Sequence, residues 1–372
     1  MEKHKKNGDW KLLRVKSDNH AVSQVISVLL VVSMVVAMMT VILFWAMPLI
    51  EEKRSENEMQ TVFYSFEIMD NTVEGLLMEG SDAKRVVGVV CPNDRGDLSF
   101  VSSTDNKLVV MYNYDDGYDF NIIGLEDQGV NDPSFDIPSN PFDKATIYFL
   151  NPSGDYAYSE DTDFVIPDDY DLGDKENLLI SIDTFTATKN LEGNLLIDLY
   201  DNTLPNPKDT IPMGRIWVFE LGSITYKAHY NFGNQKTVFE NGAIMSTGVK
   251  DKGIINNPAL IITNDKTVAL RVIQIHAVGR NSFSGRNTPK VEFDLKNSFK
   301  REKPTDYLIT TFGSHVSNLK FQIFGDNEQV WLDYFTNMDD FTISVDPNTV
   351  SYNIDGINFI LDSSFIEVDV GL

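Results

Sequence analysis

Residues 21–50 read AVSQVISVLLVVSMVVAMMTVILFWAMPLI and contain no Asp, Glu, Lys or Arg. As a helix, the stretch would extend about 45 Å, whereas the hydrocarbon core of a bilayer is about 30 Å thick. Buried helices of water-soluble proteins usually have apolar runs of about 10–14 residues, and cleaved secretory signals have about 7–15. The stretch therefore predicts a retained transmembrane helix, with Trp45 as an interfacial anchor and Pro48 as a kink or exit.

The charge on the two sides of this stretch predicts its orientation. Residues 1–20 carry a net charge of +3, which leaves −27 for the other residues of a chain whose net charge is −24. Cytoplasmic flanks of membrane helices are enriched in Lys and Arg. We therefore expect a single-pass protein in the cell membrane, with residues 1–20 in the cytoplasm and residues 51–372 outside the cell.

The composition excludes several classes of protein. Hydrophobic residues make up 42% of the chain and aromatic residues 11%, so the chain is not disordered, and a mean hydropathy of −0.18 excludes a multi-span transporter. A sequence pI near 4.5 leaves no basic surface for nucleic acid. The single cysteine, Cys91, excludes a disulfide framework and a Cys-rich zinc site, and its apolar surroundings predict a buried, inert thiol.

The basic leader followed by Ala21-Val22-Ser23-Gln24-Val25-Ile26-Ser27 resembles the N-terminus of archaeal type IV pilin-like proteins, which have class III signal peptides. The resemblance implies cleavage by a prepilin peptidase between Ala21 and Val22, so that His20, Ala21 and Val22 form the processing site. It also implies that a pilus assembly machinery packs the helix against identical or related pilins, through Val25, Ile26, Leu29 and Leu30. The chain departs from the pattern at His20, usually a charged residue, and at Ser27, often a glycine. Residues 96–100 through 107–112 resemble the strand pair that follows the helix in these proteins. Residues 214–219 and 240–244 are similar to segments of longer, mostly uncharacterised archaeal members.

Residues 51–79 predict an amphipathic helix that continues from the apolar one and ends at Gly80. Apolar residues recur mostly every three or four positions; they are Met59, Val62, Phe63, Phe66, Met69, Val73, Leu76 and Leu77. A pilin helix packed on its globular head and a stalk helix docked on its own domain both have this pattern, and the sequence favours neither.

After residue 83 the sequence predicts short β-strands, and no helix of clear periodicity is expected there. The expected strands are Arg85–Cys91, Leu98–Ser102, Lys107–Tyr114, Thr146–Leu150, Ile216–Glu220, Ser223–Tyr230 and Thr267–Val278. Turn signals such as Asn241-Gly242 separate them. The expected fold is an N-terminal transmembrane α-helix followed by a mainly-β, sandwich-like extracellular region. Residues 80–250 would form one β-rich domain, and residues 251–372 a second domain or the second half of the same sandwich.

The sequence contains no recognisable catalytic or cofactor-binding motif, so we expect neither enzyme activity nor a cofactor. Its five histidines have no metal-binding spacing, and His229 and His276 fall in expected strands. The stretch 160–174 contains seven acidic residues and no Lys or Arg. It is either a solvated acidic loop or a calcium site; the candidate ligands are Asp161, Asp163, Asp168, Asp169 and Asp171.

These observations lead to two hypotheses of function. In the first, the chain is a pilin-like structural subunit of an archaeal surface filament or pseudopilus and is inserted in the membrane before assembly. In the second, the chain is a membrane-anchored extracellular β-domain that binds or adheres to a target and does not assemble. Loss of residues 1–21 and sedimentation as filaments would distinguish the first from the second.

Overall fold

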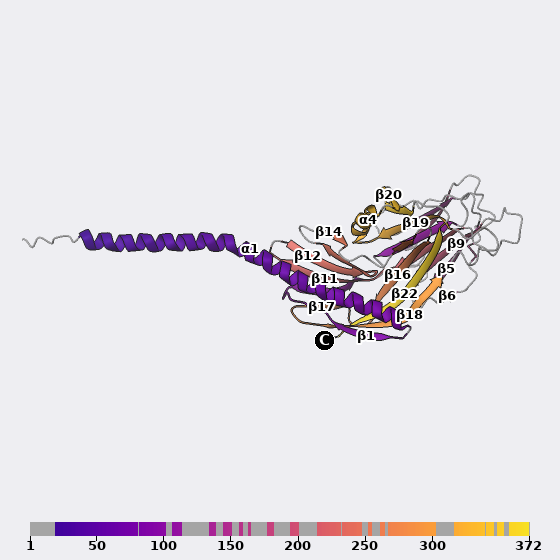
Figure 1. Cartoon of the computed structure of the whole chain (residues 1–372), viewed down its shortest axis with the longest axis horizontal. Helices are drawn as coiled ribbons and strands as arrows, with labels where there is room; N and C mark the ends of the chain where they lie inside the picture. Colours follow the sequence, from indigo (N-terminus) through magenta and orange to yellow (C-terminus); the bar gives the residue numbers. More distant parts are fainter. Residues whose placement is uncertain are drawn as a thin grey trace, which may run out of the picture. The chain divides into compact units, whose positions relative to one another are not determined.

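The protein is described from a computed structural model. The structure describes residues 19–80, 82–101, 106–113, 134–138, 144–150, 156–158, 163–164, 177–181, 194–200, 214–231, 233–247, 252–254, 261–264, 267–302, 316–338, 340–345, 348–352 and 357–371. The chain separates into two compact units, Met1–Asn57 and Glu58–Leu372. A long helix leads into a body built mainly of sheets (Figure 1), which confirms the expected helix-then-β order.

Helix α1 (Asn19–Glu79) is 61 residues long and contains one proline, Pro48. The next residue, Gly80, has a φ of +94°, a conformation that glycine adopts without steric cost and that commonly ends helices. The helix thus ends where the sequence indicates that it should.

The described strands form three large sheets and one pair. The five-stranded sheet consists, in spatial order, of β1 (Lys84–Gly88), β18 (Lys290–Glu302), β22 (Asn358–Gly371), β16 (Thr267–Ala277) and β15 (Ile261–Asn264). The six-stranded sheet consists of β14 (Lys252–Ile254), β13 (Ala243–Thr247), β12 (Gly233–Glu240), β11 (Ser223–Tyr230), β2 (Gly96–Val101) and β17 (Ser282–Ser284). The nine-stranded sheet consists of β20 (Phe341–Val345), β21 (Asn348–Tyr352), β19 (Ser317–Phe324), β3 (Lys107–Asn113), β10 (Gly214–Glu220), β9 (Asn194–Tyr200), β5 (Lys144–Leu150) and β6 (Tyr156–Tyr158), with β7 (Asp163–Phe164) on β5. Strands β4 (Ser134–Pro138) and β8 (Asn177–Ser181) pair with each other.

Strands from the two halves of the β region pair directly in each large sheet. In the five-stranded sheet β1 pairs with β18, in the six-stranded sheet β2 pairs with β17, and in the nine-stranded sheet β3 pairs with β19. The only parallel pair among the described strands joins β16 to β22. Residues 80–250 and 251–372 therefore contribute to the same sheets.

Two buried apolar clusters hold these sheets. The first is formed by the nine-stranded sheet, one face of the six-stranded sheet and the first halves of β16 and β22. The second is formed by α1, the other face of the six-stranded sheet and the second halves of β16 and β22. Strand β12 lies between the two clusters. The side chain of Val238 belongs to the first cluster, and that of the next residue, Phe239, belongs to the second. The long strands β16 and β22 thus connect both clusters.

The expectation that no helix follows residue 83 is wrong. Helix α4 (Glu328–Thr336) packs against β14 and β20 (Figure 1) and contributes Trp331 and Phe335 to the first cluster. Its nine residues make little more than two turns, and they include aromatic and β-branched types that also favour strands. A helix this short is determined by burial of its apolar side rather than by local periodicity.

Candidate functional site

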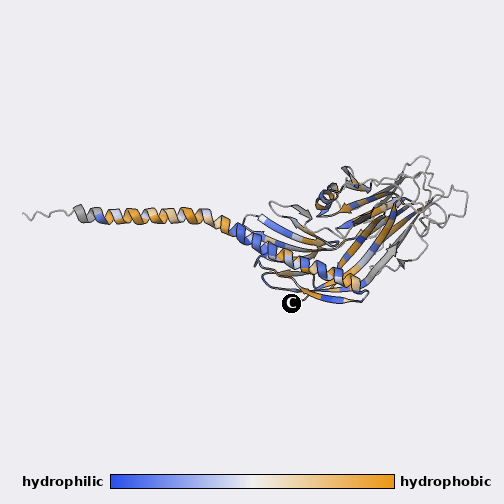
Figure 2. Ribbon diagram, in the orientation of Figure 1, coloured by the Kyte–Doolittle hydropathy of each residue, from blue (hydrophilic) through white to orange (hydrophobic). Residues whose placement is uncertain are grey.

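The first half of α1 exposes an apolar surface on all of its sides. Every Val, Ile, Leu, Met, Phe and Trp between residues 25 and 50 is between 43% and 84% exposed. Figure 2 shows this continuous apolar stretch on the helix. The most apolar window has a mean hydropathy of 2.8 and is not buried, so the helix is long and apolar enough to cross a membrane. Soluble monomers rarely expose apolar patches of this size.

The few polar side chains in this stretch bond within the helix. The Ser33 Oγ donates a hydrogen bond to the Leu29 carbonyl at 2.7 Å, and the Thr40 Oγ1 donates one to the Val36 carbonyl at 2.8 Å. A hydroxyl without a partner would lose several kcal/mol in a hydrocarbon environment. These two hydroxyls are therefore compatible with surroundings that contain no water.

The structure places the residues expected for processing and packing at the start of this surface. His20, Ala21 and Val22 lie in the first turn of α1, which begins at Asn19. The four residues expected to pack against neighbouring helices, Val25, Ile26, Leu29 and Leu30, are 53% to 61% exposed. None of the four is covered by the rest of the described chain, so all are available to lipid or to another helix.

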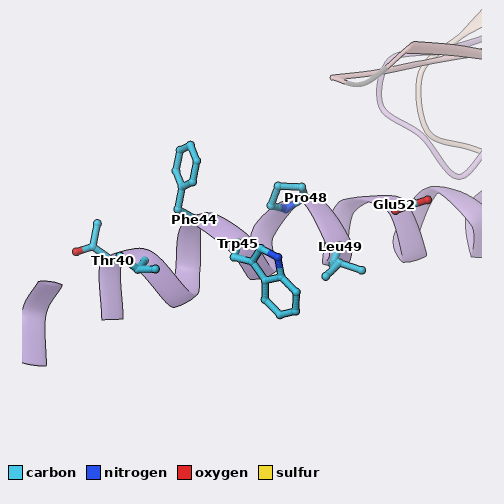
Figure 3. Close-up of a pocket in the computed structure, with 7 residues that line it drawn as sticks. Thr40, Phe44, Trp45, Pro48, Leu49 and Glu52 are labelled. Carbon is cyan, nitrogen blue, oxygen red and sulfur yellow. The ribbon is translucent and has the colours of Figure 1, made fainter. Parts of the chain in front are cut away.

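An open groove follows the helix where Pro48 interrupts it. Because proline has no backbone N–H, the carbonyl of Phe44 cannot receive the usual helical hydrogen bond. In Figure 3 the rings of Phe44 and Trp45 point to opposite sides of the helix. The groove is lined by Thr40, Val41, Phe44, Trp45, Pro48, Leu49 and Glu52. Along the helix, the lining of the groove changes from the aromatic residues Phe44 and Trp45 to the carboxylate of Glu52. Such a change is typical of the boundary between the hydrocarbon core and the headgroups of a bilayer.

The second half of α1 packs on the body. The eight apolar residues that recur in the sequence of 51–79 all belong to the second cluster or pack against it. Polar contacts add to this packing: the Tyr230 hydroxyl donates to the Glu58 carboxylate at 3.0 Å, and the Val90 N–H donates to the Ser65 Oγ at 3.2 Å. Burial, together with the nearby Glu74 and Glu67, raises the pKa of Asp70 to about 7. This carboxyl group is one that the sequence analysis missed.

A second polar site, also missed from the sequence, lies beneath α4. The Glu240 carboxylate is 2% exposed and accepts hydrogen bonds from Trp331 Nε1 at 2.8 Å, Asn327 Nδ2 at 2.8 Å and Asn106 Nδ2 at 2.9 Å. Lys236 Nζ donates to Asn327 Oδ1 at 3.3 Å. Because these residues come from three segments that are far apart in the sequence, no local motif could have indicated the cluster.

The other residues singled out in the sequence are either buried or in strands, or they fall outside the described residues. Cys91 is 1% exposed, and burial raises the pKa of its thiol to about 12. His229 and His276 lie in strands β11 and β16. Of the calcium candidates, Asp163 is in β7, whereas Asp161, Asp168, Asp169 and Asp171 fall outside the described residues. Within the described ranges, no group of three or more His, Cys, Asp or Glu could hold a metal ion.

Comparison with known proteins gives no relative for this chain: no family model, curated protein or solved structure matches it.

Proposed function

We propose that this protein is a pilin-like structural subunit of an archaeal surface filament or pseudopilus. Residues 22–50 span the membrane before assembly, with residues 1–20 in the cytoplasm and residues 51–372 outside the cell. The observation that carries the proposal is the apolar surface of α1 between residues 25 and 50, where the large apolar side chains are 43% to 84% exposed.

The size of that surface explains why it needs a partner. Burying one large apolar side chain contributes about 1.5–3 kcal/mol, so the exposed residues of 25–50 together represent on the order of tens of kcal/mol. Lipid chains cover such a surface, and so do the equivalent helices of other subunits. A subunit that moves from the bilayer into a filament exchanges one apolar environment for the other.

The continuous helix α1 fits both assembly and simple anchoring, and one further feature favours assembly. The residues around Ala21 resemble the processing site of archaeal pilin-like proteins, and cleavage there would leave the helix intact. The prepilin peptidase and the assembly machinery are the partners that this resemblance implies.

The test is the mass of the N-terminal peptide of protein purified from archaeal membranes. In a host with a prepilin peptidase we expect the mature chain to begin at Val22, and the protein to sediment as filaments without detergent. In a matched host that lacks the peptidase, residues 1–21 should remain and the protein should dissolve in detergent as a monomer. An intact leader and a detergent-soluble monomer in both hosts would instead support the anchored binding or adhesion module.

A further inference from the structure

Three side chains beneath α4 form a chain of contacts between two sheets. Lys236 lies in β12 of the six-stranded sheet, and Asn327 lies between β19 of the nine-stranded sheet and α4. The Lys236 Nζ is 3.3 Å from Asn327 Oδ1, and the Asn327 Nδ2 is 2.8 Å from Glu240 Oε2. The carboxamide of Asn327 therefore contacts the Lys236 amine through its oxygen and the Glu240 carboxyl group through its nitrogen.

We propose that Lys236 and Asn327 join in an intramolecular isopeptide bond, with Glu240 as the catalytic acid–base group. This proposal does not depend on the membrane function of α1.

The reaction needs no reagent beyond these three residues. The lone pair of a neutral Lys236 Nζ attacks Cγ of Asn327, and the carbonyl oxygen takes up negative charge. Glu240 passes a proton to Nδ2 and recovers one from the attacking nitrogen, so it ends as it began. The Cγ–Nδ2 bond breaks, ammonia leaves, and a secondary amide between Nζ and Cγ remains. No atom changes its oxidation state.

Burial shifts the pKa values of Lys236 and Glu240 in the directions that this reaction requires. Burial lowers the pKa of Lys236, and Lys227, directly opposite on β11, lowers it further, although Asp326 and Glu240 act in the other sense. Burial also raises the pKa of Glu240, although its hydrogen bonds to Trp331 and Asn327 oppose this. A neutral amine and a protonated carboxyl group are the nucleophile and the proton donor that amide exchange needs.

The neighbouring residues exclude water and fix the carboxyl group. Asn327 is 3% exposed, so the amide that reacts is shielded from hydrolysis. Trp331 Nε1 donates to Oε1 of Glu240, and Asn106 Nδ2 donates to Oε2. Trp331 and Asn106 are therefore positioning residues, and they hold Glu240 against the nitrogen that leaves.

Tryptic digestion of the full-length protein, purified in detergent and then denatured, tests the proposal. Trypsin does not cut after a lysine whose amine is in an amide, so residues 228–250 should remain one peptide. This peptide should be joined to residues 321–372, which contain no Lys or Arg, with a combined mass lower by about 17 Da, the mass of ammonia. Cleavage after Lys236, with residues 321–372 found as an unlinked peptide of full mass, would overturn the proposal.

Substitutions distinguish the isopeptide bond between Lys236 and Asn327 from other reactions that release ammonia. Lys236→Arg and Glu240→Gln should abolish the linked species, whereas Lys227→Arg, a control on the facing strand, should retain it. Asn327→Asp should give a linked species formed by loss of water, about 18 Da, instead of ammonia. A loss of about 17 Da confined to the unlinked peptide 321–372 would indicate a succinimide at one of its asparagines and contradict the proposal.

Discussion

At the scale of single residues, the turn between β12 and β13 joins local geometry to a distant contact. Asn241 has a φ of +49° and Gly242 a φ of +72°, the signs that a two-residue hairpin turn of type I′ requires. The Asn241 side chain also accepts a hydrogen bond from the buried N–H of Ile273 in β16 at 2.6 Å. This asparagine therefore connects the six-stranded and five-stranded sheets as well as forming a turn.

Two substitutions of Asn241 separate these roles. Asn241→Ala should destabilise the protein by about 3 kcal/mol, because the Ile273 N–H loses its partner and alanine is strained at positive φ. Asn241→Gly removes only the hydrogen bond and should cost about 1–2 kcal/mol. Urea unfolding of the full-length protein in detergent measures both, and equal losses would show that the backbone conformation contributes nothing.

The raised pKa of Asp70 predicts how stability depends on pH. Its pKa is about 7 in the folded protein, against an ordinary value of 3.8 for an aspartate. Between these values the folded state binds more protons than the unfolded state, so this group makes stability fall as pH rises from about 4 to about 7. The loss is complete above about pH 7.

Asp70→Asn tests this dependence. After allowance for the partial exposure of Asp70, the variant should be more stable than the wild type by about 1–2 kcal/mol at pH 8 and should depend less on pH. Asp94→Asn, a control at an exposed turn residue, should change neither property. Unfolding midpoints across pH 4–8 supply the measurement, and parallel curves for the wild type and Asp70→Asn would contradict the prediction.

At the scale of elements, the second half of α1 has one face on the body and one face in solvent. Phe66 is completely buried in the second cluster, whereas Ile68, two residues later, is 58% exposed. Phe66→Ala should therefore cost about 3–5 kcal/mol, and the matched control Ile68→Ala less than about 1 kcal/mol. Similar losses in urea unfolding would mean that this part of α1 does not pack on the body as described.

Sequence patterns predicted the elements that depend on local chemistry. The apolar run, the three-to-four-residue spacing and Gly80 together define α1, and seven expected strands overlap β1, β2, β3, β5, β10, β11 and β16. The two longest strands were missed. Strand β18 carries irregular pairing around Asn297, and β22 contains Asp362-Ser363-Ser364, which by itself resembles a turn. Their partners in the sheet, rather than their own sequence, determine these strands.

One candidate site could be recognised from the sequence and the other could not. The exposed apolar residues of 25–50 could be read directly from the sequence, because an uncharged run requires no partner to be recognised. The cluster of Lys236, Glu240 and Asn327 could not, because 91 positions separate the lysine from the asparagine. Lys236 and Glu240 share strand β12, and only the packing of the two sheets brings Asn327 against them.

At the scale of the whole molecule, the five-stranded sheet depends on its central strand. Strand β22 lies between β18 and β16, and its residues belong to both apolar clusters. Deletion of residues 358–372 should therefore prevent the body from folding, because β16 and β18 lose the strand between them and both apolar clusters lose side chains. Limited proteolysis of the protein in detergent should then digest residues 84–357. A protected body in this deletion would contradict the prediction.

The position of β22 also determines when the protein can fold during its synthesis. Strand β1 pairs with β18 more than 200 positions later, and β22 is made after every strand that it joins. The apolar helix, which is long and apolar enough to cross a membrane, leaves the ribosome first, while most of the β region is still absent. Such long-range pairing is slow and leaves strand edges open to aggregation. A cell that makes this protein therefore has an unfolded chain, with an exposed apolar helix, to protect for as long as its synthesis takes.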